Sequence, residues 1–151
     1  MHVFDLVRRN NMVRCYPYCI GLNYDRQISI TQKQWEKEDI DVIAQLILKD
    51  LRKLEISARI VDKRYVPSAK ENILALKVGI RMKHDEYLYH SNYHIIVKKE
   101  DGYWYSKVDN LPAEKLPLTT DIESWDWQAS NKKAKKKYYN SKIVYIAFIK
   151  P

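Results

Sequence analysis

The chain has 151 residues, of which 46% are hydrophobic, and it carries a formal net charge of +8. The hydrophobic fraction excludes a globally disordered protein, and no apolar run approaches the roughly 18 residues that a membrane span needs. The length predicts a single domain, residues 1–151, with its own core. Residues 1–11 are polar and charged and contain no secretory h-region, so we expect a cytoplasmic location or export by a route that leaves no trace in the sequence, including delivery into another cell.

A short helix is predicted at residues 15–21, where two cysteines lie four positions apart. Pro17 is tolerated in a first helical turn, and Gly21 suits the C-terminal stop. Cys15 is then expected at the helix N-terminus, where the dipole and the unpaired N–H groups favour a thiolate. Cys15 and Cys19 are poorly spaced for a disulfide and too few for a structural zinc site, so a chemical role for one of them is the simplest interpretation.

The main helix is predicted within residues 31–54, because apolar residues recur there at spacings of three and four. This stripe consists of Ile40, Ile43, Ile47, Leu51 and Leu54. Residues 56–61 are expected to form a first strand. Residues 74–82 alternate between apolar and other side chains, which is typical of a half-buried strand.

Residues 93–109 predict a β-hairpin, since two β-prone runs are joined by Asp101-Gly102, a strong turn signal. If these two residues form the whole loop, His94 lies directly opposite Asp109 on one face of the sheet. A carboxylate in that position orients an imidazole. A three-residue loop instead pairs His94 with Val108 and moves Asp109 off that face.

The last strand is predicted at residues 143–149, a nearly continuous apolar run expected to lie centrally in the sheet. Residues 123–128, with Trp125 and Trp127, predict a short turn of helix packed on that sheet. Helices come first and several hairpin-linked strands follow, which favours an α+β fold with a mostly antiparallel sheet.

A cysteine at a helix N-terminus, a histidine on a later strand and an acid on the next strand together make the plan of a papain-like thiol enzyme. The candidates are Cys15 as the nucleophile, His94 as the general base and Asp109 as the orienting group. The Cys15 backbone N–H would form half of an oxyanion hole, and Asn11 or Asn10 would supply the other donor.

Several short motifs support this plan through a resemblance. They are Cys15-Tyr16-x-Tyr18, Tyr93-His94, Asp101-Gly102-x-Trp104-x-x-Lys107 and Ile143-Val144-Tyr145-Ile146-Ala147. They resemble a group of small bacterial and phage-encoded proteins with Cys-Tyr-Ala-Tyr-Ala early and Asp-Tyr-His and Asp-Gly-x-Trp-x-x-Lys late. That group is similar in plan to papain-like cysteine peptidases, including the compact YopT-like type.

The resemblance implies a papain-like fold and matches Cys15 and His94 to the nucleophile and base of the group. The sequence departs from the group at three positions. Asn92 stands where the group has Asp, Cys19 replaces a small residue, and Asp109 stands where the group often has Gly. The expected activity is that of a peptidase, deamidase or acyltransferase acting on an amide or thioester bond of a protein or peptide, without a cofactor.

The alternative is a non-catalytic binding protein of a phage or mobile element that meets nucleic acid or an acidic protein through a basic, aromatic face. Its basic patch is Lys132, Lys133, Lys135, Lys136 and Lys137. Its aromatic residues are Tyr103, Trp104, Tyr105, Tyr138 and Tyr139, which are suited to stacking on single strands. The lysine run also fits a solvated loop, and the aromatic residues also fit ordinary sheet packing.

No metal site is expected. His90 and His94 have the four-residue spacing of helical zinc ligands, but on a strand that spacing spans about 13 Å. The oligomeric state and the substrate are not encoded in any recognisable motif.

Overall fold

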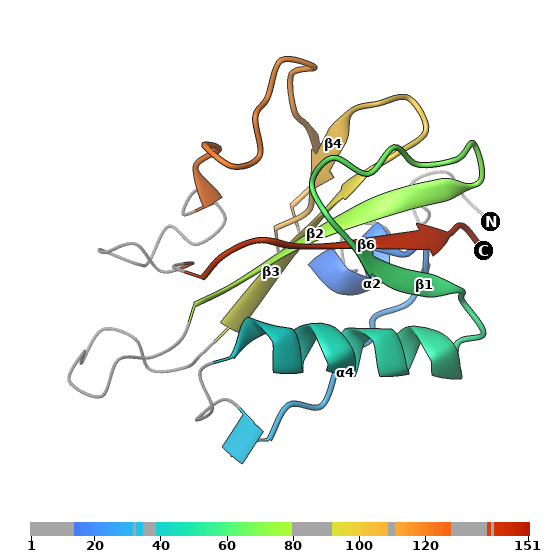
Figure 1. The fold of residues 1–151 in the computed structure, drawn as a ribbon, viewed down its shortest axis with the longest axis vertical. Helices are drawn as coiled ribbons and strands as arrows, with labels where there is room; N and C mark the ends of the chain where they lie inside the picture. The colour runs from blue at the N-terminus through green and yellow to red at the C-terminus, as the bar shows by residue number, and fades with distance from the viewer. Residues whose placement is uncertain are drawn as a thin grey trace.

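The computed structural model describes residues 14–31, 33–34, 39–79, 92–108, 111–127, 139 and 141–151. Two helices pack on a sheet: α2 (Cys15–Cys19) and α4 (Ile40–Lys53). The strands are β1 (Ala58–Val61), β2 (Glu71–Gly79), β3 (Asn92–Lys98), β4 (Trp104–Ser106), β5 (Glu114–Lys115) and β6 (Val144–Ile149). They form one antiparallel sheet in the order β1-β6-β2-β3-β4-β5 (Figure 1), so the predicted α+β class is confirmed.

Helix α4 begins at Ile40 because the Asp39 side chain caps it, accepting a hydrogen bond from the Asp41 N–H at 2.8 Å. Its predicted stripe is buried at Ile40, Ile43, Ile47 and Leu51. The helix ends where Glu55 adopts a positive φ of 60°, which lets the Glu55 and Ile56 N–H groups bond back to the last turn. No helix in the described part of the chain is long and apolar enough to cross a membrane.

Helix α2 ends at Cys19, two residues before the predicted stop at Gly21, where the chain turns with a φ of +82°. The Gly21 and Leu22 N–H groups bond to the Tyr18 and Pro17 carbonyl oxygens, which are otherwise unpaired at a helix end. After this turn, Leu22, Ile28 and Ile30 pack against the core of the helix face.

A buried polar cluster fixes α2 and the segment after it against α4. The Tyr16 hydroxyl donates to Asp50 at 2.7 Å, and Arg26 holds the same carboxylate with two hydrogen bonds of 2.9 and 2.6 Å. These bonds hold the pKa of Asp50 below its ordinary value against the opposing effect of burial.

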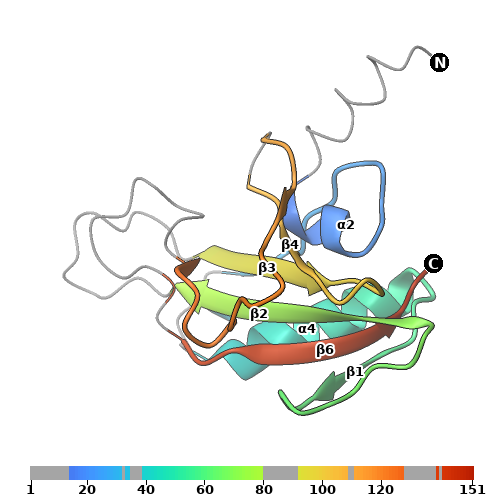
Figure 2. The same ribbon diagram turned by 90° about the horizontal axis from the view of Figure 1, so that it is seen from above.

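The sheet is covered on both faces (Figure 2). We call the side beneath α2 and α4 the helix face; its sheet residues include Leu74, Leu76, Ile95, Val97 and Ile146. We call the other side the tryptophan face, where Ala75 and Ile96 pack against Leu116, Ile122, Trp127 and Tyr139. Strand β6 has a hydrogen-bonded neighbour on each side, β1 and β2, which confirms its predicted interior position.

The segment 121–127 forms turns on the tryptophan face. The indole N–H of Trp127 donates to the Ile122 carbonyl oxygen at 3.1 Å, and the ring is 1% exposed. The predicted packing of this segment on the sheet is therefore confirmed.

The β3–β4 hairpin has a three-residue loop. The register pairs Ile96 with Ser106 and Lys98 with Trp104, and Gly102 takes a φ of +82°. Two positions further along, this register puts Val108 opposite His94. Of the two loop lengths that the sequence allows, the structure has the longer one, and its register is shifted by one position from the register that would set Asp109 opposite His94. Asp109 itself lies outside the described residues.

Candidate functional site

The two cysteines lie on the helix face. Cys15 is the first residue of α2 and is partly buried, while the Cys19 thiol is buried and donates to the Ile95 carbonyl oxygen at 3.4 Å. Burial raises the pKa of Cys19 well above its ordinary value. Cys15 lies near Tyr93, whose pKa is raised first by burial and then by its electrostatic interaction with Cys15. Cys19 is therefore a packing residue.

His94 lies on the tryptophan face and is 4% exposed. Its ring centroid is 6.5 Å from Trp125, 6.1 Å from Trp127 and 5.9 Å from Tyr139. Its Nε2 forms a hydrogen bond with Ser106 Oγ at 3.1 Å. Burial lowers the pKa of His94 to about 4, so the imidazole is neutral near pH 7.

The structure does not bring Cys15 and His94 together. Successive residues of a strand point to opposite faces, and in β3 the side chains of Tyr93 and Ile95 lie beneath α2 while His94 lies among Trp125 and Trp127. The sheet separates the thiol from the imidazole, so His94 is not positioned to accept the Cys15 proton. Asn11, Asp109 and the predicted basic patch lie outside the described residues, and their roles stay predictions.

Among the described residues, lysine and tyrosine side chains gather on one surface beside α2 on the helix face. We call it the tyrosine–lysine surface; its members are Tyr18, Lys99, Tyr103, Tyr105 and Lys115. The Lys99 ammonium lies 5.0 Å from the Tyr18 ring centroid and 4.4 Å from that of Tyr105. It also donates to the Tyr18 hydroxyl at 3.2 Å. The Lys115 ammonium lies 3.9 Å from the Tyr103 centroid and 5.9 Å from that of Tyr105.

One carboxylate, that of Asp101, joins this surface. It accepts hydrogen bonds from the Tyr105 hydroxyl and from the Tyr103 N–H, and it lies 3.7 Å from the Lys115 ammonium. The Tyr105 hydroxyl is the main reason why the pKa of Asp101 is below its ordinary value. With two ammonium groups and one carboxylate, the surface has a net positive charge.

Sequence reasoning found this surface only in part. Tyr103 and Tyr105 were expected in a basic aromatic face, but Trp104 points to the tryptophan face and Tyr139 is buried there. Lys115 was missed because it reaches Tyr105 only through the β4–β5 pairing. The sequence pattern that indicates this surface is the alternation of Tyr103 and Tyr105 around Trp104.

Among the described residues no group of three or more metal-ligating side chains gathers. Comparison of the whole chain with known proteins finds no matching family model, no similar curated protein and no similar solved structure.

Proposed function

We propose that this protein is a non-catalytic binding module on a papain-like scaffold, and that it engages an anionic partner through the tyrosine–lysine surface. The observation that carries the proposal is the pair of lysines, Lys99 and Lys115, held over three tyrosine rings beside a single carboxylate. The scaffold is proposed from the resemblance and from the packing of the cysteine helix α2 against the histidine strand β3.

The positions of the two lysines favour anion binding. Among the described residues Lys99 forms no ion pair within 4.0 Å of a carboxylate, so the groups in direct contact with its ammonium are tyrosine rings and a hydroxyl, while the Asp101 carboxylate interacts with it at longer range. An exposed cation–π contact is worth about 0.5–1 kcal/mol, which restrains the side chain without neutralising it. A restrained cation loses less conformational entropy when an anion binds.

A thiol enzyme has less support, because the imidazole expected to activate Cys15 is buried on the other face of the sheet. If the protein is a binder, Cys15→Ala will leave its affinity unchanged.

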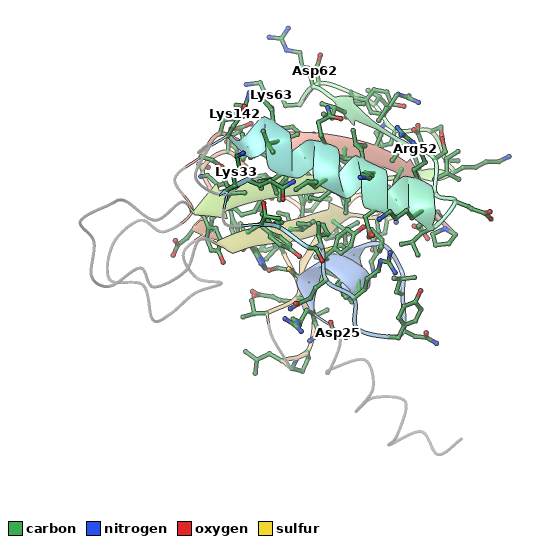
Figure 3. All side chains as sticks on the ribbon, turned by 90° about the horizontal axis from the view of Figure 1, so that it is seen from below. Asp25, Lys33, Arg52, Asp62, Lys63 and Lys142 are labelled. Atoms are coloured by element: carbon green, nitrogen blue, oxygen red, sulfur yellow. The ribbon has the colours of Figure 1, made fainter. Side chains whose placement is uncertain are left out.

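The test is a binding panel of polyanions: heparin, polyglutamate, and single- and double-stranded oligonucleotides. At least one should bind, and its affinity should fall as salt rises. The double variant Lys99→Ala/Lys115→Ala should weaken this binding at least tenfold. The matched control is Lys63→Ala/Lys142→Ala, which removes the same charge on the α4 side of the molecule, away from α2 (Figure 3). Equal losses in the two double variants, or no binding to any polyanion, would contradict the proposal.

A further inference from the structure

Tyr103 and Tyr105 form a short aromatic ladder on β4, the strand next to the edge strand β5. They flank Trp104, so both side chains belong to the helix face, about 6.7 Å apart along the strand. Both are partly exposed. The Lys99 ammonium lies over the rings of both Tyr18 and Tyr105, which brings Tyr18 of α2 into the same surface.

Each ring of the ladder carries an ammonium group. Lys115 lies over Tyr103, and Lys99 lies over Tyr105. Ring and cation therefore alternate across strands β4 and β5. This is the arrangement with which proteins bind single-stranded nucleic acid, whose bases stack on rings while its phosphates pair with cations.

We infer that the partner of the tyrosine–lysine surface is single-stranded nucleic acid, with bases stacked on Tyr103 and Tyr105 and phosphates paired with Lys99 and Lys115. The inference rests on the proposed function and specifies its partner. A duplex keeps its bases stacked internally and would use the lysines alone. An acidic protein would likewise leave the two rings without a partner.

Asp101 provides an independent check. Its carboxylate lies 3.7 Å from the Lys115 ammonium and would repel an approaching phosphate. Asn at this position keeps one oxygen that can accept from the Tyr103 N–H, and its amide nitrogen can donate to the Tyr105 hydroxyl in place of the second carboxylate oxygen. Asp101→Asn should therefore tighten binding about threefold, a gain that damage to the fold does not produce.

The experiment measures fluorescence anisotropy of a labelled strand of about 12 nucleotides. The affinity for this strand is compared with the affinities for the same strand carrying abasic sites, for its duplex and for labelled polyglutamate. We expect the intact single strand to bind most tightly. Tyr103→Leu and Tyr105→Leu should each weaken it about tenfold, while the exposed Tyr24→Leu serves as the control. Because Tyr105 also packs on the core, urea unfolding of each variant verifies the fold.

The outcomes separate the two proposals. If the abasic strand, the duplex or polyglutamate binds as tightly as the intact strand, or if Tyr103→Leu has no effect, the nucleic-acid inference is overturned. Dependence on Lys99 and Lys115 would then still support an anionic partner. If no ligand binds in a manner that depends on these lysines, both proposals fail.

Discussion

Acidification should destabilise the fold through His94, because an imidazolium cannot be hydrated on the tryptophan face. The ring is 4% exposed and lies among Trp125, Trp127 and Tyr139. Lys77, the Cα partner of His94 in β2, carries a second positive charge and lies over Trp127. Protonation must therefore take place in an apolar site with a cation nearby, and the neutral form is favoured.

The magnitude follows from the pKa of His94, which burial lowers from 6.5 to about 4. Between these two pH values the unfolded chain binds a proton that the folded protein does not bind, so stability rises with pH across this window. The contribution is fully retained above pH 6.5 and is lost as the pH falls to about 4. At about 1.4 kcal/mol per pKa unit, the loss amounts to about 3 kcal/mol, a large part of a typical folding free energy.

The assay is urea unfolding followed by tryptophan fluorescence at several pH values between the two pKa values of His94 and above them. The comparison variant is His94→Gln, which keeps a partner for Ser106 and does not titrate. Both proteins contain the same carboxylates and the same other histidines, so their difference isolates His94. Wild type should lose about 3 kcal/mol more than His94→Gln across the window. If the free energies of unfolding of the two proteins change in parallel with pH, His94 is not the source of this pH dependence.

Three further predictions concern the helix face and the hairpin. Asp50→Ala leaves the Tyr16 hydroxyl and the Arg26 guanidinium without their shared acceptor. It should lower the free energy of unfolding, measured with urea, by about 2 kcal/mol. A change near zero would show that the cluster does not stabilise the fold. Iodoacetamide should label Cys15 well before Cys19, because the Cys19 thiol is buried and its pKa is raised. Peptide mass spectrometry gives the order of labelling. Equal labelling rates would contradict the packing of α2. Gly102→Ala should cost about 1 kcal/mol in the same urea assay, because φ is +82° there; Gly102→Asn should cost less.

Periodicity predicted the parts of the fold that depend on local spacing. The stripe through Ile43 and Ile47 is buried because helical spacing places these residues on one side, whatever lies opposite. The start of α4 was not predictable from that stripe, because it depends on a hydrogen bond from the Asp41 N–H to the Asp39 side chain. The two neighbours of β6 follow from long-range pairing, which no local pattern contains.

The site was less predictable, because it depends on loop length and on which face each helix covers. Asp101-Gly102 identified the turn, but the same dipeptide suits loops of two and three residues. Alternation required Tyr93 and His94 to point to opposite faces without indicating which side α2 would occupy. The contacts of Lys99 with Tyr18 and Tyr105 join three separate segments of the chain.

His94 faces away from α2, on the side of the sheet where the tryptophans pack. Strand β3 is buried on both sides, so burial alone gives it no preferred orientation. Its neighbour β2 presents Leu74 and Leu76 to the helices but Ala75 to Trp127, and Ala75 pairs with Ile96. Trp125 and Trp127 pack on that face, and His94 packs with them. The same orientation of β3 and its neighbour β4 places Tyr93 beside Cys15 and Tyr105 in the core cluster with α2. The packing that separates the Cys15 thiol from the His94 imidazole thus also assembles the tyrosine–lysine surface. A single orientation of β3 therefore cannot serve both the predicted thiol site and the proposed binding surface.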